Sequence, residues 1–364
     1  MTNKYIDRFH DHLLRWFQEN KRSLPWRKSP DWYKTYLSEV ILQQTTIEQG
    51  LPYFEKFLKT YPSITELARA DEQDILNLWA GLGYYSRARN LLKAAKIIVG
   101  EHNACFPAEY KKALKIPGVG PYSASAILSI AYKKPFPAID GNVVRVISRI
   151  FAIKDDIRQA QTLKIIKNKA EKMLNRNHPG DYNEAVMELG AMVCTPRKPL
   201  CRECPINSFC KAFANNVISE IPYKSPAKAR KKKYQIVCIL KHNSKFLIGH
   251  NPDKGLLAGM WELPAIELNQ KHFEKESRVI LKKNNIVVKS ESKLFRHIYS
   301  HIDLTFKAII AESDQKNNYF NQYTDHRWIK LEEVETYPIH NAHKKILNWY
   351  KGEAKNQTRE KGKN

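Results

Sequence analysis

The sequence predicts a multidomain protein, with an all-α domain first and a domain of mixed α+β type second. Its 364 residues exceed what one domain of ordinary size needs. Apolar residues recur at helical spacing as far as about residue 213, and beyond a basic stretch they form short strand-like runs. Four of the six cysteines lie within residues 194–210, which indicates a metal-binding loop at the end of the helical part.

The helical domain is expected to span residues 1–222. Leucine, isoleucine and aromatic residues repeat every three or four positions, most clearly around residues 13–17, 75–79 and 91–98. Proline and glycine separate the segments, for example at Pro52 and Pro62. This pattern predicts a series of short helices and little strand.

The next segment, 223–233, has six basic residues and no apolar periodicity, so we expect an exposed basic linker. An α+β domain is then expected at 234–350. Its expected strands are 234–240, 246–249, 286–288 and 303–310, and its expected helices are 270–284 and 342–350. The polar tail, 351–364, is expected to be disordered.

The charge of the chain points to a polyanionic partner. Lysine and arginine number 61 against 37 acidic residues, a formal charge of +24, and neutralised phosphates release counterions that drive binding. A lysine-rich surface without such a partner is the plainer alternative. No run of 18 apolar residues and no secretory core is found in the sequence. We therefore expect a cytoplasmic, chromosome-associated protein.

The clustered cysteines are Cys194, Cys201, Cys204 and Cys210, separated by six, two and five residues. Four unrelated buried thiols are one alternative, and a zinc site with four thiolates is a stronger one. Zinc modules usually pair two Cys-x-x-Cys units, whereas this loop has one. A single compact run is more typical of an iron–sulfur loop. The remaining two, Cys105 and Cys238, are expected to be packing residues.

A glycine hairpin, Ile-Pro-Gly-Val-Gly-Pro at 116–121, separates two helical segments at 109–115 and 122–132. Gly118 and Gly120 let the backbone turn tightly and bring N–H groups close to a ligand. The following helix adds its N-terminal partial charge, so a phosphate is a suitable guest.

Two carboxylates are candidates for chemistry. Ser38 is expected to cap a helix, which would place Glu39 in its first turn, where it would merely compensate the helix dipole. Apolar neighbours instead favour a desolvated Glu39 with a raised pKa, able to donate a proton near neutrality. Asp140 is either an ordinary N-cap for the helix starting near Gly141 or a fixed anion facing developing positive charge. The spacing does not decide between these readings.

From about Phe9 to Tyr350 the sequence resembles the endonuclease III superfamily, and within it the A/G-specific adenine glycosylases of MutY type. Besides the hairpin and the cysteine loop, the matching motifs are Leu-Pro-Trp-Arg (24–27), Ser-Glu-Val-Ile-Leu-Gln-Gln-Thr (38–45), Gly-Leu-Gly-Tyr-Tyr (81–85), Ile-Asp-Gly-Asn-Val (139–143) and Tyr-Asn-Glu-Ala-Val-Met-Glu-Leu-Gly (182–190). The resemblance implies an all-α helix–hairpin–helix glycosylase domain with a [4Fe–4S] cluster loop, and a C-terminal α+β domain similar to Nudix hydrolases.

The resemblance also implies residue roles. Glu39 would protonate the adenine, and Asp140 would stabilise the sugar cation. Tyr122 and Asn142 would support the reacting sugar and water. Residues that would line the adenine pocket or contact DNA are Trp26, Arg27, Gln44, Thr45, Leu82, Gly83, Tyr84, Gly118, Gly120 and Glu184, with Gln44 and Tyr84 as wedges in the base stack. The cluster ligands would be Cys194, Cys201, Cys204 and Cys210.

These residue types suit base excision. Adenine leaves poorly as an anion, so a ring nitrogen must be protonated as it departs, and a nearby carboxylate steadies the oxocarbenium-like sugar. The base must first be flipped out of the duplex. A bifunctional glycosylase/lyase of the same superfamily places a Schiff-base lysine two residues after the hairpin's second glycine. Here Tyr122 occupies that position, so efficient β-elimination is not expected.

The segment Gly-Leu-Leu-Ala-Gly-Met-Trp-Glu-Leu-Pro (255–264) resembles the one that leads into the Nudix catalytic region. The acidic Arg-Glu-x-x-Glu-Glu helix of a working hydrolase does not follow it. In the family this domain senses 8-oxoguanine opposite the adenine, and Tyr299, Ser300 and His301 match the loop used for that. The plainer alternative is a set of polar residues at a strand end.

Three classes of function remain open on the sequence. The first is a monofunctional adenine DNA glycosylase, acting as a monomer on duplex DNA with adenine opposite 8-oxoguanine or guanine. The second is a DNA-binding scaffold that has lost chemistry, which the presence of Glu39 and Asp140 argues against. The third is a nucleotide hydrolase run by the C-terminal domain, which the missing acidic helix argues against.

Overall fold

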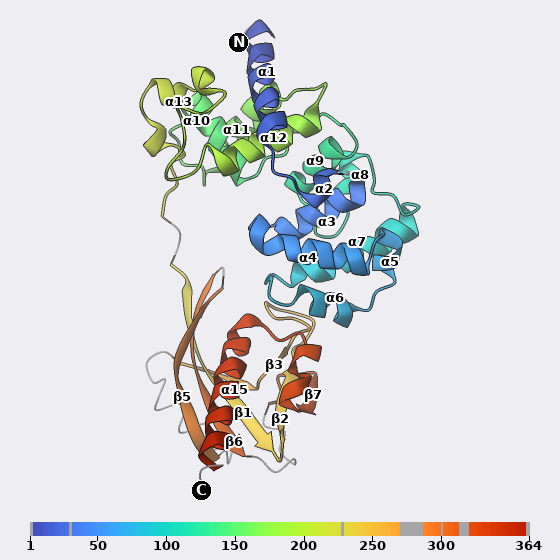
Figure 1. Ribbon diagram of the computed structural model, residues 1–364, viewed down its shortest axis with the longest axis vertical. Helices are drawn as coiled ribbons and strands as arrows, with labels where there is room; N and C mark the ends of the chain where they lie inside the picture. Colours follow the sequence, from blue (N-terminus) through green and yellow to red (C-terminus); the bar gives the residue numbers. More distant parts are fainter. Residues whose placement is uncertain are drawn as a thin grey trace. The chain divides into compact units, whose positions relative to one another are not determined.

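We describe a computed structural model of the chain, within which residues 3–28, 31–226, 229–269, 287–299, 301–312 and 320–361 are described. The chain divides into two compact units (Figure 1). Unit 1 comprises Met1–Ala70 and Asn90–Pro226, and unit 2 comprises Asp71–Arg89 and Ala227–Asn364. No helix among the described residues is long and apolar enough to cross a membrane.

Unit 1 is helical, as the periodicity predicts. Its elements are α1 (Asn3–Asn20), α2 (Pro25–Lys28), α3 (Trp32–Leu42), α4 (Ile47–Thr60), α5 (Ile64–Ala68), the later part of α7 (Ser86–Glu101), α8 (Tyr110–Ala113), α9 (Pro121–Ile130), α10 (Gly141–Phe151), α11 (Ala160–Met173), α12 (Pro179–Met192), η1 (Asn207–Phe209), α13 (Lys211–Ala214) and η2 (Ile218–Glu220). Helix α9 packs against both α3 and α12, and α12 also packs against α1 and α10. The helices that carry the candidate residues therefore meet around α9.

Helix α3 begins earlier than the sequence suggested. Asp31 is its N-cap and accepts a hydrogen bond from the Lys34 N–H at 2.8 Å. Ser38 is buried inside the helix, and its hydroxyl donates to the Thr35 carbonyl. The expected Ser38 cap is therefore wrong, because Asp31 already satisfies the first turn. Glu39 consequently lies in the second half of α3, where dipole compensation at the N-terminus does not apply.

Unit 2 contains a mixed sheet with strand order β3-β2-β1-β6-β5. The strands are β1 (Lys231–His242), β2 (Lys245–His250), β3 (Trp261–Glu262), β4 (Ala265–Leu268), β5 (Val287–Ile298), β6 (Ile302–Glu312) and β7 (Asp325–Ile329), followed by η4 (Leu331–Thr336) and α15 (Asn341–Lys361). Strand β4 pairs with β1, and β7 pairs with β2. Helix α6 (Glu72–Trp79) also belongs to this unit. The α+β prediction is confirmed, whereas the helix expected at 270–284 lies outside the described residues.

Alternation along β1 builds a core on each side of the sheet. Val237 and Ile239 pack with residues of α15 such as Ile346, and Ile236 and Leu240 belong to a second cluster on the opposite face. Figure 1 shows α15 lying along the sheet. Cys238 is buried, as expected of a packing residue, but Cys105 is exposed, so that part of the expectation is wrong.

Two expected boundaries need correction. Lys231–Lys233 were expected in the linker but pair in parallel with Ile302–Leu304 of β6, because backbone hydrogen bonds form a strand ladder whatever the side chains. The tail was expected to be disordered, but α15 continues to Lys361. Beyond Tyr350 most residues are Glu, Ala, Lys, Gln or Arg, which are good helix formers, so an established helix propagates through the stretch despite Gly352.

Candidate active site and cluster loop

A cavity of about 1060 Å³ in unit 1 brings most of the candidate residues together. Its volume is at the upper end of the range typical of ligand sites, about 300–1,000 Å³. The predicted residues that line it are Trp26, Arg27, Glu39, Gln44, Thr45, Gly118, Gly120, Tyr122, Asp140, Asn142 and Glu184. These come from five regions distant in sequence, so the fold assembles what the motifs separately suggested.

Glu39 lies on α3 at the wall of this cavity. Burial raises the pKa of its carboxyl to about 7, and the negative charges of Asp140 and Glu184 also raise it. A hydrogen bond with Tyr122 acts in the opposite direction. A carboxylic acid with such a pKa retains its proton near neutrality and transfers it readily, as a general acid must.

Asp140 is both the N-cap of α10 and part of the cavity wall, so the two readings of the sequence coexist. Its Oδ1 accepts a hydrogen bond from the Val143 N–H, and its Oδ2 accepts one from Asn142 Nδ2, each at 2.7 Å. Burial raises the pKa of Asp140, while these hydrogen bonds and the charge of Arg145 lower it. Two hydrogen-bond donors therefore hold the Asp140 carboxylate in a fixed position in the cavity wall.

Asn142 is itself fixed by its neighbours. Arg145 Nη2 donates to Asn142 Oδ1 at 2.8 Å and to the Gly190 carbonyl at 2.8 Å. Gly190 on α12 has no side chain, and a Cβ there would lie 2.6 Å from Asn142 Cβ. Position 190 must therefore remain glycine for α10 and α12 to approach this closely. The sequence shows this glycine at the end of a matching motif, but not the contact it permits.

A cluster of charged side chains, Arg27, Glu184 and Glu188, also lines the cavity. Arg27 Nε binds Glu184 Oε1 at 2.7 Å, and Arg27 Nη2 binds Glu188 Oε2 at 3.1 Å. Glu188 also receives two hydrogen bonds from Arg22 at 2.8 Å. The sequence analysis missed Glu188 and Arg22. The signal was present, because positions 184 and 188 lie one turn apart on the same face of α12.

Tyr122 is the second residue of α9, directly after the glycine hairpin. Its hydroxyl lies 3.3 Å from Met187 Sδ and within hydrogen-bonding reach of Glu39. Burial, followed by the charges of Glu39 and Asp140, raises its pKa well above the ordinary value. The hydroxyl therefore keeps its proton and acts as a donor.

The hairpin has the backbone that the sequence predicts. Gly118 has φ +79°, and a Cβ there would lie 2.9 Å from Asn90 Cβ, so both conformation and space require glycine. Gly120 is the N-cap of α9, with Pro121 in the first turn. Gln44 is exposed with φ 57°, a strained conformation for a residue with a side chain. Strain of this kind is common where a side chain is held out for a ligand.

Three predicted DNA-contacting residues lie in unit 2, in the turn between α6 and α7. Gly83 and Tyr84 both have positive φ, +73° and +48°, and the Tyr84 ring is 42% exposed. An exposed aromatic ring such as that of Tyr84 suits insertion between the bases of DNA. Leu82 is only 6% exposed, so its side chain is a packing group and only its backbone is available to DNA.

The expected opposite-base loop joins β5 to β6. The Tyr299 N–H donates to the Ile302 carbonyl at 2.9 Å, and the Tyr299 ring is half-buried while His301 is exposed. Ser300 lies outside the described residues.

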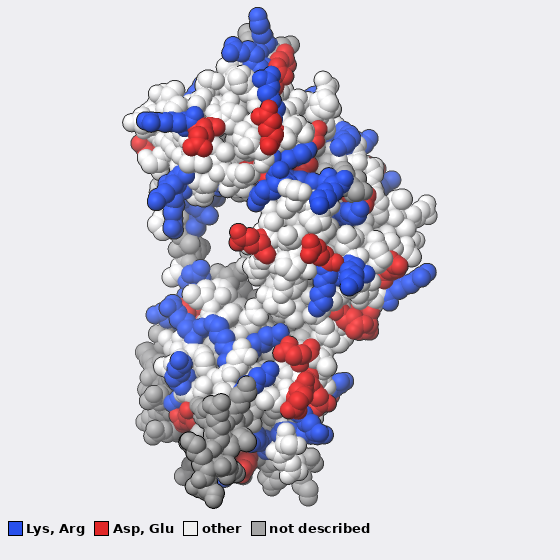
Figure 2. Space-filling model, viewed as in Figure 1, with Lys and Arg blue, Asp and Glu red and all other residues white. Residues whose placement is uncertain are grey.

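Figure 2 shows lysine and arginine side chains spread over the drawn face of both units, with acidic side chains between them.

The four clustered cysteines are free thiols in unit 1. Burial raises the pKa of Cys204 to about 12, and the charges of Cys194, Cys210 and Cys201 also raise it, so the four sulfurs lie close enough to interact. A thiol with such a pKa is neutral until a metal deprotonates it.

A buried cation beside the loop fits the same group. Arg149 is 2% exposed, and its Nη1 lies 3.2 Å from Cys194 Sγ. Its other partners are the carbonyls of Cys194, Thr195, Pro196 and Ile221. Within the described ranges no carboxylate pairs with Arg149. Because a buried charge is stable only beside a counter-charge, the thiolates of these cysteines would supply one for Arg149 when a metal is bound.

Comparison with known proteins gives three family matches along the chain. Residues 37–174 match the HhH-GPD superfamily base excision DNA repair proteins, residues 194–210 match the iron–sulfur binding domain of endonuclease III, and residues 235–349 match the NUDIX domain. The second match covers all four clustered cysteines. The protein therefore carries a [4Fe–4S] cluster, ligated by the loop that the sequence predicted.

Relatives extend over nearly the whole chain. An adenine DNA glycosylase of Schizosaccharomyces pombe is 32% identical, covering 92% of this chain and 87% of its own. An adenine DNA glycosylase of Buchnera aphidicola subsp. Schizaphis graminum is 31% identical, covering 94% and 99%.

The solved structures agree with these relatives. A thermostable thymine-DNA glycosylase matches with a TM-score of 0.52 and 26% identity, covering 58% of this chain and 98% of its own. An endonuclease III trapped on DNA shares the fold, with a TM-score of 0.50 and 19% identity over 59% and 99% of the two chains. The protein is thus a DNA glycosylase of two domains, and the chain belongs to the adenine DNA glycosylase family of HhH-GPD base excision repair proteins.

Proposed function

We propose that the protein excises adenine mispaired with 8-oxoguanine or guanine from duplex DNA, by hydrolysis and without strand cleavage. The observation that carries this proposal is the position of Glu39, whose pKa is raised to about 7, in one cavity with Asp140 and Glu184. A proton donor, a fixed anion and a recognition carboxylate are the groups that purine excision requires.

The flipped adenine occupies the cavity between Trp26 and the Arg27–Glu184 ion pair. Trp26 offers an aromatic surface, itself packed edge-on against Phe54 at 4.9 Å. Glu184, fixed by Arg27 at 2.7 Å, is an acceptor for the exocyclic amino group that distinguishes adenine from guanine at the same ring position. The site therefore selects its base by a hydrogen bond as well as by shape.

Excision begins with proton transfer from Glu39 to a ring nitrogen of the adenine. As the glycosidic bond breaks, positive charge develops on the sugar, and the anion of Asp140 stabilises it. Asn142 orients Asp140 through a hydrogen bond, and the Tyr122 hydroxyl donates a hydrogen bond to Glu39 close to the sugar. Water then adds to the sugar and passes a proton to the Glu39 carboxylate, which restores the acid and leaves an abasic site with an intact strand.

The domains divide the work. The helical unit performs excision, and the Nudix-like domain, which begins with β1 at Lys231, examines the opposite base through Tyr299, Ser300 and His301. The adjacent surface is basic, with Lys231 and Lys232 exposed where β1 begins beside His301, which suits the phosphates of the strand being examined. The protein acts as a monomer on chromosomal DNA in the cytoplasm.

Single-turnover excision tests the proposal on duplexes that carry adenine opposite 8-oxoguanine, guanine or thymine. We expect the fastest release opposite 8-oxoguanine, slower release opposite guanine and the slowest opposite thymine. His301→Ala should erode the preference for 8-oxoguanine over guanine. Equal rates on all three duplexes would overturn the opposite-base assignment, and release of another base in place of adenine would overturn the assignment of the pocket.

A further inference from the structure

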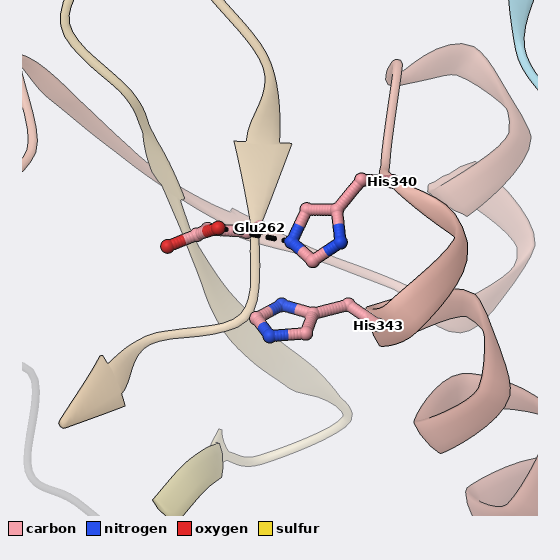
Figure 3. Close-up of side chains that lie close together, drawn as sticks. All are labelled: Glu262, His340 and His343. Atoms are coloured by element: carbon pink, nitrogen blue, oxygen red, sulfur yellow. Dashed lines mark hydrogen bonds and ion pairs between the residues drawn. The ribbon is translucent and has the colours of Figure 1, made fainter. Parts of the chain in front are cut away.

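A buried polar cluster in unit 2 lies outside the excision site. It consists of Glu262 on β3, His340 just before α15, and His343 in its first turn. All three are at most 8% exposed. Figure 3 shows the Glu262 carboxylate directed at the His340 ring, with the His343 ring beside it. Buried polar side chains are costly unless each is hydrogen-bonded, so their partners reveal what the cluster does.

The partners of Glu262 and His340 form a directional series. His340 Nε2 lies 2.9 Å from Glu262 Oε2, and the Tyr323 hydroxyl donates to Glu262 Oε1 at 2.8 Å. The pKa of Glu262 falls to about 2 because its hydrogen bonds and charged neighbours outweigh its burial, so the carboxylate is charged and accepts a hydrogen bond from His340 Nε2. The other ring nitrogen of His340, Nδ1, lies 3.3 Å from the Tyr299 hydroxyl.

A metal ion is the other function that a Glu-His-His group suggests, and the hydrogen bonds argue against it. The Leu263 N–H donates to His343 Nδ1 at 3.1 Å, so neutral His343 carries its proton on Nε2 and offers no free lone pair. Burial lowers the pKa of His343 to about 3, which keeps the ring neutral. His340 and Glu262 are likewise committed to protein partners, which argues against a metal held by the three side chains.

We propose that Glu262 and His340 are positioning residues for opposite-base discrimination, which hold the recognition loop in register by anchoring the Tyr299 hydroxyl. The inference rests on the proposed function of that loop. Tyr299 is the residue through which the loop enters the core, since its ring packs on the cluster that α15 and the sheet form. His343 ties α15 to β3 and thereby fixes the His340 ring, whose centroid lies 4.1 Å from its own.

A double-mutant cycle tests the proposal. Tyr299→Phe removes the hydroxyl and keeps the ring, while His340→Gln keeps a donor toward Glu262 and removes the ring nitrogen that faces Tyr299. Each variant should lower the ratio of single-turnover rates, 8-oxoguanine over guanine, by about two- to tenfold, the range one hydrogen bond confers. Because both changes break the same contact, the double variant should lose no more than either single variant.

The control is His250→Gln. His250 also bonds through both ring nitrogens, to Thr324 Oγ1 and to the Gly259 carbonyl, and neither bond reaches the loop. For His250→Gln, the ratio of the excision rate opposite 8-oxoguanine to the rate opposite guanine should equal that of the wild type. Thermal melting should show that all variants are folded. A wild-type ratio near one would contradict the proposed function instead. Retention of the wild-type ratio by both variants, additive losses in the double variant, or one bound zinc per chain that His340→Gln abolishes would each overturn the inference.

Discussion

Because the pKa of Glu39 is raised on folding, we predict that its ionisation lowers the free energy of unfolding at alkaline pH. The shift from 4.5 to about 7 amounts to 2.5 units, or about 3 kcal/mol at 1.36 kcal/mol per unit. Since the pKa is raised on folding, the folded state binds the extra proton between these values. Stability is therefore full below pH 4.5 and falls as the pH rises through 7.

Glu39→Gln removes that titration. The variant should melt at the same temperature as the wild type near pH 4.5 and several degrees higher at pH 8, because about 3 kcal/mol corresponds to a shift of that size in a domain of this length. Circular dichroism melts at intervals between pH 4.5 and 8.5 measure the difference, with Glu48→Gln, an exposed first-turn residue of α4, as the control. A melting difference that stays constant with pH would refute the reasoning.

Four further outcomes follow from the site. The wild-type excision rate should fall about tenfold per pH unit above 7, as Glu39 loses its proton, in single-turnover assays from pH 6 to 9. Asp140→Asn keeps an N-cap for α10 but removes the anion, so excision should slow by roughly 10²–10³-fold with little change in melting temperature. Gly190→Ala forces a Cβ to 2.6 Å from Asn142 and should cost about 1–3 kcal/mol in denaturant unfolding. Borohydride should trap little covalent DNA complex; efficient trapping would indicate a lyase.

The sequence was most informative where one residue type has one physical use. Four cysteines in a basic chain indicated metal ligation, and the Gly118 turn indicated a close backbone approach, because few alternatives satisfy those patterns. The class of each domain followed from the change in apolar periodicity near residue 223, since helices and strands bury residues at different spacings.

Local patterns failed where a tertiary contact or a competing cap decided the outcome. Ser38 is a residue type common at N-caps, but Asp31, seven positions earlier in the sequence, caps the helix instead. Glu188 and Gly190 stand in the motif at 182–190, but their importance depends on contacts with Arg22 and Asn142, 166 and 48 positions away, which the local sequence does not show. Leu82 stands in a motif whose residues are expected to contact DNA, although its own side chain is buried.

The most direct measurement is adenine release by Glu39→Gln in a single turnover on a duplex with adenine opposite 8-oxoguanine, beside the dissociation constant for a duplex with a non-cleavable adenine nucleotide. A glutamine fits the same space but has no acidic proton to give. The account predicts that release is lost, by at least ~10²-fold, while the dissociation constant stays within about threefold of the wild type. Near-normal release at unchanged affinity would contradict proton transfer from position 39.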